Sequence, residues 1–137
     1  MATATETTQE TVRAYHKAWT GPDVATAGAH IADEFTTRAP VGSYDTREDY
    51  LAGLANFRNQ FVTGVDLIAE FYANEEATLL YDVRTNTPAG TIRTAEYFKL
   101  RRGKIASTIL IFDATAWRAM LATQGKTVDA EGHVINM

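Results

Sequence analysis

One carboxylate lies on the strand face that alternation assigns to the protein interior. In segment 91–100, TIRTAEYFKL, every second side chain falls on the same face, and Glu96 lies at the centre of one face. That face is otherwise apolar or small: Ile92, Thr94, Phe98 and Leu100. Burial raises the pKa of a carboxyl group, so Glu96 is a candidate general acid–base unless Arg38, Arg84 or a hydroxyl group binds it. The structural alternative is an ion pair with an arginine at the rim of the sheet.

The residues for other kinds of catalysis are missing or scattered. The chain has no cysteine, which excludes thiolate nucleophiles, disulfides and sulfur-ligated metals. It has three histidines in no metal-binding pattern: His16, His30 and His133. No glycine-rich phosphate loop and no Ser-His-Asp set is recognisable. We therefore expect neither a metal nor a cofactor.

Length and charge favour one soluble domain. With 137 residues, 45% of them hydrophobic and 22% charged, the chain is long enough to bury a core of its own. A net charge of −4 argues against nucleic-acid binding, which depends on clustered lysine and arginine. The one basic cluster flanks a tight turn: Lys99, Arg101, Arg102 and Lys104. Without a signal-peptide pattern or a run of 18 apolar residues, we expect a cytoplasmic protein with no membrane or nucleic-acid partner.

Helical periodicity predicts three helices in the first half of the chain. Thr7 and Glu10 have the spacing of a capping box, which starts a first helix that runs to about Trp19. A second helix begins near Pro22 with the apolar stripe Val24, Ala27 and Ile31. The short strand FTTRA follows it. Thr46 then caps a third helix with the buried stripe Tyr50, Leu51, Leu54 and Phe57.

After Gly64 the hydrophobic period changes to two. Four strands are expected to form an antiparallel meander, at residues 65–73, 77–85, 91–100 and 104–112. A last helix is expected at 113–121, and residues 123–137 form either a small hairpin or a loose tail. Because no linker or repeat divides the chain, we expect a single domain over 1–137 with its core at about 7–122.

Helices followed by strands indicate an α+β fold, in which a curved antiparallel sheet wraps around the N-terminal helices as a cone with an internal pocket. Aromatic side chains from several elements are expected to converge on the pocket with Tyr15. Those predicted to bind substrate are Trp19, Tyr44, Phe57, Tyr81, Phe98 and Phe112. Ile109 and Ile111 lie on the outer face of the last strand, so a homodimer through the sheet is expected.

Several segments together resemble a known superfamily. They are YHKAW in the first helix, GPDVA at the second, FTTRAPVGSYDTRE before the third, and EYFKLRRGKIASTILIFD in the last two strands. Over about residues 7–122 the chain resembles the nuclear transport factor 2-like superfamily, and within it the SnoaL-like polyketide cyclase branch. The resemblance implies the cystatin-like cone of the ketosteroid isomerases. The superfamily includes isomerases, cyclases, epoxide hydrolases, dehydratases and members without catalysis, so the fold alone names no reaction.

The resemblance also suggests roles for individual residues. In ketosteroid isomerases a tyrosine of the first helix and a strand aspartic acid donate hydrogen bonds to the substrate oxyanion, and Tyr15 and Glu96 match these positions. The proton-moving aspartate of those enzymes corresponds to Ala39, so that mechanism is not expected. Polyketide cyclases use an aspartate that closes the last strand. Asp113 matches it, although Thr108 replaces the histidine of those cyclases.

The expected function is a cofactor-independent isomerase, cyclase or lyase that acts on a small hydrophobic carbonyl or polyketide-like compound. Glu96, Asp113 and Tyr15 are the catalytic candidates, although Asp113 can instead cap the last helix through backbone N–H groups. One alternative is a small-molecule binding protein that has the same pocket and no catalysis. A docking module is another, and it would have a cone filled by side chains.

Overall fold

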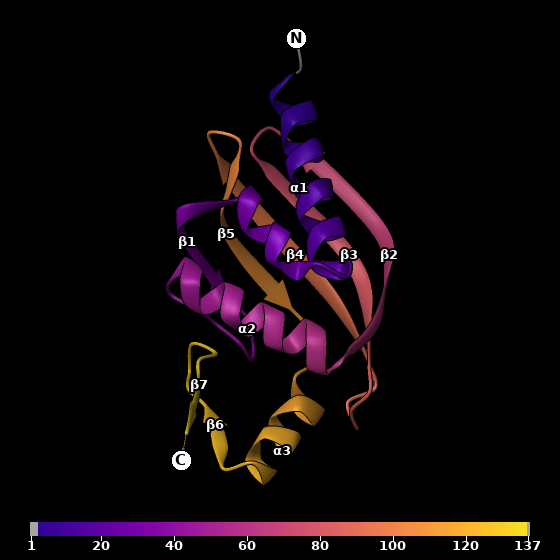
Figure 1. Ribbon diagram of the computed structural model, residues 1–137, viewed down its shortest axis with the longest axis vertical. Helices are drawn as coiled ribbons and strands as arrows, with labels where there is room; N and C mark the ends of the chain where they lie inside the picture. The colour runs from indigo at the N-terminus through magenta and orange to yellow at the C-terminus, as the bar shows by residue number, and fades with distance from the viewer. Residues whose placement is uncertain (1–2, 137) are drawn as a thin grey trace.

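The N-terminal helices precede the long antiparallel strands, as the sequence predicts, with one strand between the second and third helices (Figure 1). The computed structural model describes residues 3–136. Helix α1 (Ala4–Thr20) is followed by the helix η1 (Val24–His30), strand β1 (Ile31–Arg38) and helix α2 (Arg47–Gln60). The long strands are β2 (Val62–Ala73), β3 (Glu76–Thr85), β4 (Thr91–Arg101) and β5 (Lys104–Ile111). The last elements are α3 (Thr115–Thr123), β6 (Lys126–Val128) and β7 (Val134–Asn136).

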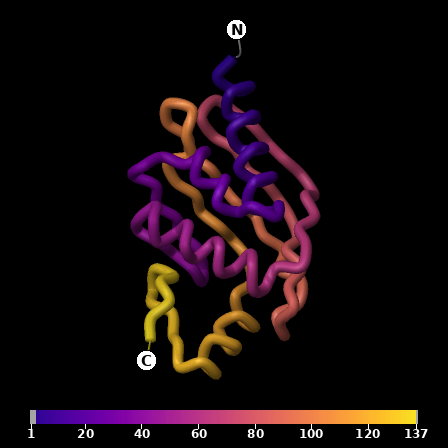
Figure 2. Tube along the Cα trace, in the orientation of Figure 1, coloured from indigo at the N-terminus to yellow at the C-terminus, as the bar shows by residue number. Residues whose placement is uncertain are grey.

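The long strands form one curved sheet against which the helices pack. Its order is β1-β5-β4-β3-β2, and β2 to β5 pair antiparallel, as predicted. Strand β1 adds a parallel pair with β5 at one edge. Register shifts in β2 and between Lys99 and Leu100 mark bulges, which strengthen the local twist. Figure 2 shows α1, η1 and α2 on one side of this sheet, with β2 curving around them.

Helix α1 begins one turn earlier than predicted. The pattern Thr-x-x-Glu occurs twice in succession, at Thr3–Glu6 and at Thr7–Glu10. The first copy forms the capping box, in which the N–H group of Glu6 donates to Thr3 Oγ1 at 3.1 Å. Thr7 lies inside the helix, and its N–H group donates to the carbonyl oxygen of Thr3. The predicted capping box at Thr7 and Glu10 was wrong because both copies have the same residue types at the same spacing, so the local sequence does not distinguish them.

The second and third helices differ in how closely they follow the prediction. The second is a 3₁₀ helix, and Ile31, which was expected in its stripe, is the first residue of β1. The cap of the third is confirmed, since the N–H group of Asp49 donates to Thr46 Oγ1 at 3.2 Å. Within residues 3–136, no helix combines the length and apolar character needed to cross a membrane.

The predicted inward faces of the strands are confirmed. The buried residues of β3 and β4 include Leu79, Tyr81, Val83, Thr94, Glu96, Phe98 and Leu100. On the opposite face of β5, Ile109 and Ile111 are 47% and 66% exposed. A partner subunit that covers this face stays a prediction.

Candidate functional site

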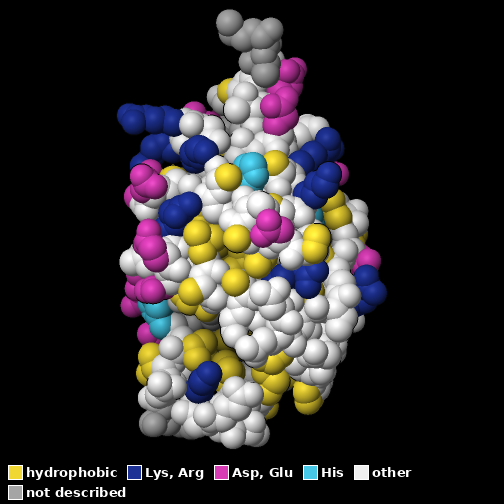
Figure 3. All heavy atoms as spheres, viewed as in Figure 1, with side chains coloured by type: hydrophobic (Ala, Val, Ile, Leu, Met, Phe, Trp, Pro, Cys, Tyr) yellow, Lys and Arg dark blue, Asp and Glu magenta, His cyan; other side chains and the backbone are white. Residues whose placement is uncertain are grey.

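A cavity of about 580 Å³ opens between α2, the sheet and the C-terminal segment. In Figure 3 hydrophobic side chains gather between α2 and the C-terminal hairpin, where the surface is hollowed. Aromatic side chains from α1, α2, α3 and the sheet form much of the cavity wall. Within residues 3–136, no three histidine, aspartate or glutamate side chains are grouped to hold a metal ion. A cavity of this size accommodates a ligand of a few rings.

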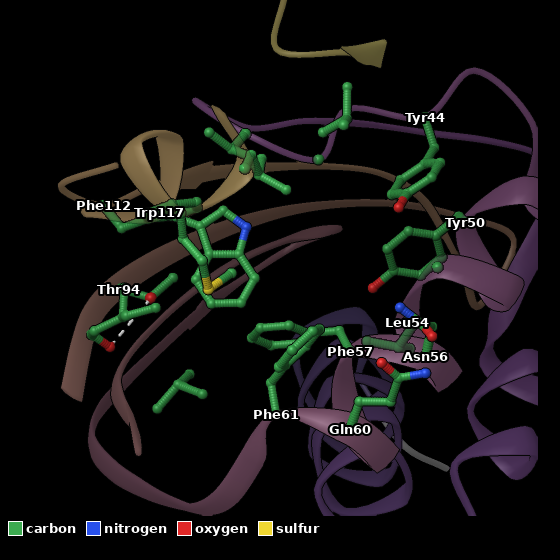
Figure 4. A pocket seen from close by; sticks show the side chains of 18 of the residues that line it. Tyr44, Tyr50, Leu54, Asn56, Phe57, Gln60, Phe61, Thr94, Phe112 and Trp117 are labelled. Carbon is green, nitrogen blue, oxygen red and sulfur yellow. Dashed lines mark hydrogen bonds between the residues drawn. The ribbon is translucent and has the colours of Figure 1, made fainter. Parts of the chain in front are cut away.

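Helices α2 and α3 contribute an aromatic wall. The ring centroid of Trp117 lies 5.6 Å from that of Phe57 and 5.4 Å from that of Phe61, with the ring planes close to perpendicular. This is the edge-to-face arrangement that aromatic rings prefer. Figure 4 shows these three rings together, across the cavity from Tyr44 and Tyr50. The wall therefore suits a flat, apolar ligand.

A buried carboxyl group lies behind the cavity wall. Glu96 is 2% exposed, and its Oε1 accepts a hydrogen bond of 2.7 Å from the hydroxyl group of Tyr81, which lines the cavity. The sheet register produces this contact. Tyr81 on β3 lies opposite Thr94 on β4, so Glu96 is its diagonal neighbour on the same face.

Burial controls the protonation of Glu96. Desolvation raises its pKa from 4.5 to about 7, and the hydrogen bond from Tyr81 opposes this rise. The two arginines considered from the sequence bind other carboxylates: Arg38 pairs with Asp45, and Arg84 with Asp66. A hydroxyl group therefore binds Glu96, and the alternative of an ion pair at the rim is wrong. Near neutral pH both the acid and the carboxylate are populated, which suits a group that accepts and returns a proton.

Two further phenols lie beside Glu96. The hydroxyl groups of Tyr15 and Tyr50 are hydrogen-bonded to each other; Tyr50 lines the cavity, and Tyr15 lies buried behind it. Burial, together with the negative charge of Glu96, raises the pKa of both phenols far above neutrality. Both therefore remain protonated, and Tyr50 presents a hydroxyl group supported by Tyr15 to a ligand.

The sequence pattern of the SnoaL-like domain matches residues 12–108, most of the chain. The chain belongs to the SnoaL-like domain family. None of the curated proteins matches this SnoaL-like chain. Its family and its curved sheet agree with the resemblance found in the sequence.

Solved structures agree with the SnoaL-like assignment. A protein from Kribbella flavida DSM 17836 is 30% identical, with a TM-score of 0.74 over 84% of this chain and 93% of that one. A protein with the ketosteroid isomerase-like fold from Catenulispora acidiphila DSM 44928, in complex with trimethylamine, is 18% identical, with a TM-score of 0.69 over 82% and 92% of the two chains. An NTF2-like protein from Mesorhizobium loti is 19% identical, with a TM-score of 0.72 over 82% and 96%. The last two show the fold alone.

Most aromatic residues predicted to bind substrate line the cavity of this SnoaL-like protein: Trp19, Tyr44, Phe57, Tyr81 and Phe112. Phe98 does not. It is 0% exposed, and its ring packs edge-on against Tyr15 in the core, 6.0 Å between centroids. Its prediction as a binding residue is therefore corrected to core packing. Tyr15 does not line the cavity, but its hydroxyl group is hydrogen-bonded to that of Tyr50, which does.

Asp113 is not brought to the cavity. Its side chain is exposed, and Oδ1 accepts a hydrogen bond of 3.0 Å from the N–H group of Thr115 in the first turn of α3. This bond lowers the pKa of Asp113, in contrast to Glu96. Asp113 thus binds a backbone N–H group at the start of α3, as the capping alternative expects, but the N-cap residue itself is Ala114. Glu96 is the carboxyl group that lies next to the cavity wall.

Sequence reasoning missed several lining residues of the SnoaL-like cavity, including Tyr50, Phe61 and Trp117. Tyr50 was expected only as core. Phe61 follows Phe57 by four residues, so extending the helical stripe by one turn would have found it. Trp117 shares one side of the last helix with Met120 and Leu121, which also line the cavity, but the sequence does not show where that side packs.

The C-terminal segment forms a hairpin, one of the two predicted alternatives, and it closes one side of the cavity mouth. The carbonyl oxygen of Gly132 accepts bonds from the N–H groups of Gly42 and Ser43 at 2.8 and 2.9 Å. The ring of His133 lies between Asp45 and Asp129, and the pairing with Asp45 is the main cause of its raised pKa. These contacts position β6 and β7, which contribute Lys126 and Val134 to the cavity lining.

Replacing Gly132 with alanine should undock this hairpin. Gly132 has φ of +93°, and a Cβ there would lie 1.9 Å from the carbonyl oxygen of Ala39. We expect hydrogen exchange at the amides of Gly42 and Ser43 to accelerate at least about tenfold in Gly132→Ala. Gly125→Ala is the matched control, because Gly125 has φ of +74° and open space around it. Equal exchange in the two variants would show that the hairpin is not held by this contact.

Proposed function

We propose that the protein catalyses a cofactor-independent proton transfer, of the isomerase, cyclase or lyase class, on a small hydrophobic carbonyl compound. The observation that carries this proposal is the buried Glu96 carboxyl group, with a pKa of about 7, hydrogen-bonded to the cavity-lining Tyr81. A general base works best when its pKa is close to the working pH. Family membership supports the class of reaction without naming the substrate.

The side chains have distinct roles in this proposal. The Tyr50 hydroxyl group, supported by Tyr15, donates a hydrogen bond to the carbonyl oxygen of the ligand. The Tyr81 hydroxyl group takes a proton from the carbon next to that carbonyl while it gives its own proton to Glu96. The resulting enolate is stabilised by Tyr50, and the proton returns along the same path to a different carbon. Protons balance, and no oxidant or reductant is needed.

The cavity wall supports an aromatic or polyketide-like ligand. The aromatic wall of α2 and α3 offers ring faces and edges for stacking. Trp19 also lines the cavity, and its buried Nε1–H group has no acceptor among the described residues. A buried donor without an acceptor is costly, so a second oxygen on the ligand would stabilise the complex by accepting from it.

Proton transfer can be tested before the natural substrate is known. Ligands that co-purify with the protein would be identified by mass spectrometry and incubated with it in D₂O, together with a panel of small ketones. We expect deuterium to enter at the carbon next to the carbonyl faster than in buffer alone. Ligands that bind and exchange no faster than in buffer would contradict the proposal.

A non-catalytic binding protein is the second candidate, and one observation favours it. Glu96 itself does not line the cavity, because Tyr81 lies between them. A ligand recovered unaltered at full occupancy after long incubation would support this second function.

A further inference from the structure

The cavity has one charged side chain in its wall. Among the described lining residues, Lys126 of β6 is the only one with a formal charge, and it is half-buried. Strand β6 lies outside the sheet, beyond α2, whereas Glu96 lies at the centre of β4 (Figure 1). Strand β6 and the middle of β4 therefore lie in different parts of the molecule.

Lys126 has no counter-ion among residues 3–136. Among residues 3–136, no carboxylate lies within 4.0 Å of its ammonium group, and no hydrogen bond from it is formed. Two carboxylates near the hairpin are already bound by other groups. Asp129 accepts from His133 and from two backbone N–H groups, and Asp45 binds Arg38 and His133.

Lys126 is half-buried beside an apolar wall, and residues 3–136 supply no partner for its ammonium group. An anion placed next to it would pair with it, and the attraction is stronger than in bulk water because the apolar wall lowers the local dielectric constant. A cationic ligand would be repelled for the same reason. A lysine without a partner in the described part of the chain thus selects for ligands with an acidic group.

We propose that Lys126 determines substrate specificity by binding an acidic group, so that the substrate is a hydrophobic carbonyl compound that also carries a carboxylate. The carbonyl group lies at Tyr50, the apolar body lies along Phe57 and Trp117, and the carboxylate lies at Lys126. This inference rests on the proposed function, because it describes the ligand of the same cavity.

Two fluorescent probes of nearly equal shape test the role of Lys126. Anilinonaphthalene sulfonate carries one negative charge, and phenylnaphthylamine has the same rings without it. The two tryptophans of the chain, Trp19 and Trp117, both line the cavity, so energy transfer from them is strongest to a probe bound in this site. We expect Lys126→Met to weaken binding of the anionic probe about five- to tenfold and to leave binding of the neutral probe unchanged.

Three controls make the test specific. Lys126→Arg should restore anion binding, because it keeps the charge. Lys99→Met should change neither probe, since Lys99 is exposed on β4 and does not line the cavity. High salt should weaken binding of the anionic probe to the unmodified protein and not to Lys126→Met, because salt screens the ion pair between the probe and Lys126.

Each remaining outcome has a definite meaning. Equal binding of the anionic probe by Lys126→Met and the unmodified protein would overturn the role of Lys126 and leave the proposed proton transfer intact. Equally weakened binding of both probes by Lys126→Met would also overturn the role of Lys126, since the lysine would then act on the shape of the cavity. If neither probe bound the unmodified protein, the cavity would not be a ligand site, and the inference and the proposed function would fail together.

Discussion

Raising the pH from 4.5 to 8 is expected to remove about 3 kcal/mol of stability through Glu96, and Glu96→Gln should abolish this loss. The pKa of Glu96 is raised from 4.5 to about 7 in the folded protein, so the folded state holds the proton more tightly than the unfolded state. The stabilising contribution is complete below pH 4.5 and is lost as the pH rises through about 7. The difference between the two pKa values corresponds to about 3 kcal/mol.

Urea unfolding at a series of pH values would measure this effect as the difference between Glu96→Gln and the unmodified protein. The variant should be the more stable of the two at pH 8 and should lose this advantage at low pH. Glu76→Gln is the matched control, because Glu76 also accepts a hydrogen bond from a tyrosine, Tyr97, but on the exposed face of the sheet. A pH dependence that is the same in Glu96→Gln as in the unmodified protein would mean that Glu96 is not held in a desolvated site.

The fold was predictable where local chemistry decides. Alternation along β4 assigns Glu96 to the inner face whatever the rest of the chain does, because a shift by one residue would expose the whole apolar set. The cap of α2 is likewise a local contact between Thr46 and Asp49. Prediction failed at the start of α1, where Thr3 and Thr7 offer the same local signal.

The candidate site was less predictable. Alternation shows which side chains of a strand face inward, but it does not show which of them the helices cover and which line the cavity. Along the inner face of β4, Ile92 and Thr94 line the cavity, whereas Phe98 and Leu100 belong to the core beneath the helices. Glu96 lies between these two pairs. The boundary is set by the packing of α1, whose Tyr15 meets Phe98 edge-on, and no periodicity within β4 marks this position.

Glu96→Gln is also expected to lower the rate of deuterium exchange into a bound ketone about 10²- to 10⁴-fold, the usual contribution of a general base. Tyr81→Phe should cause a loss in the same range, because the proposed proton path passes through its hydroxyl group. In the unmodified protein the rate should rise with pH and level off above about 7, as the Glu96 carboxylate forms. Binding of the neutral fluorescent probe should be unchanged in Glu96→Gln, which separates lost chemistry from a damaged cavity.

Two carboxylate variants complete this test. Glu76→Gln should retain the full exchange rate, because its carboxyl group lies on the exposed face of the sheet. Asp113→Asn should retain it as well, since Asp113 binds the start of α3 and does not line the cavity. If Asp113→Asn lost exchange while Glu96→Gln kept it, the proton would be moved at the end of β5, as in the polyketide cyclases that the sequence resembles. Losses confined to Glu96→Gln and Tyr81→Phe would instead assign proton transfer to the hydrogen-bonded pair that joins β3 and β4.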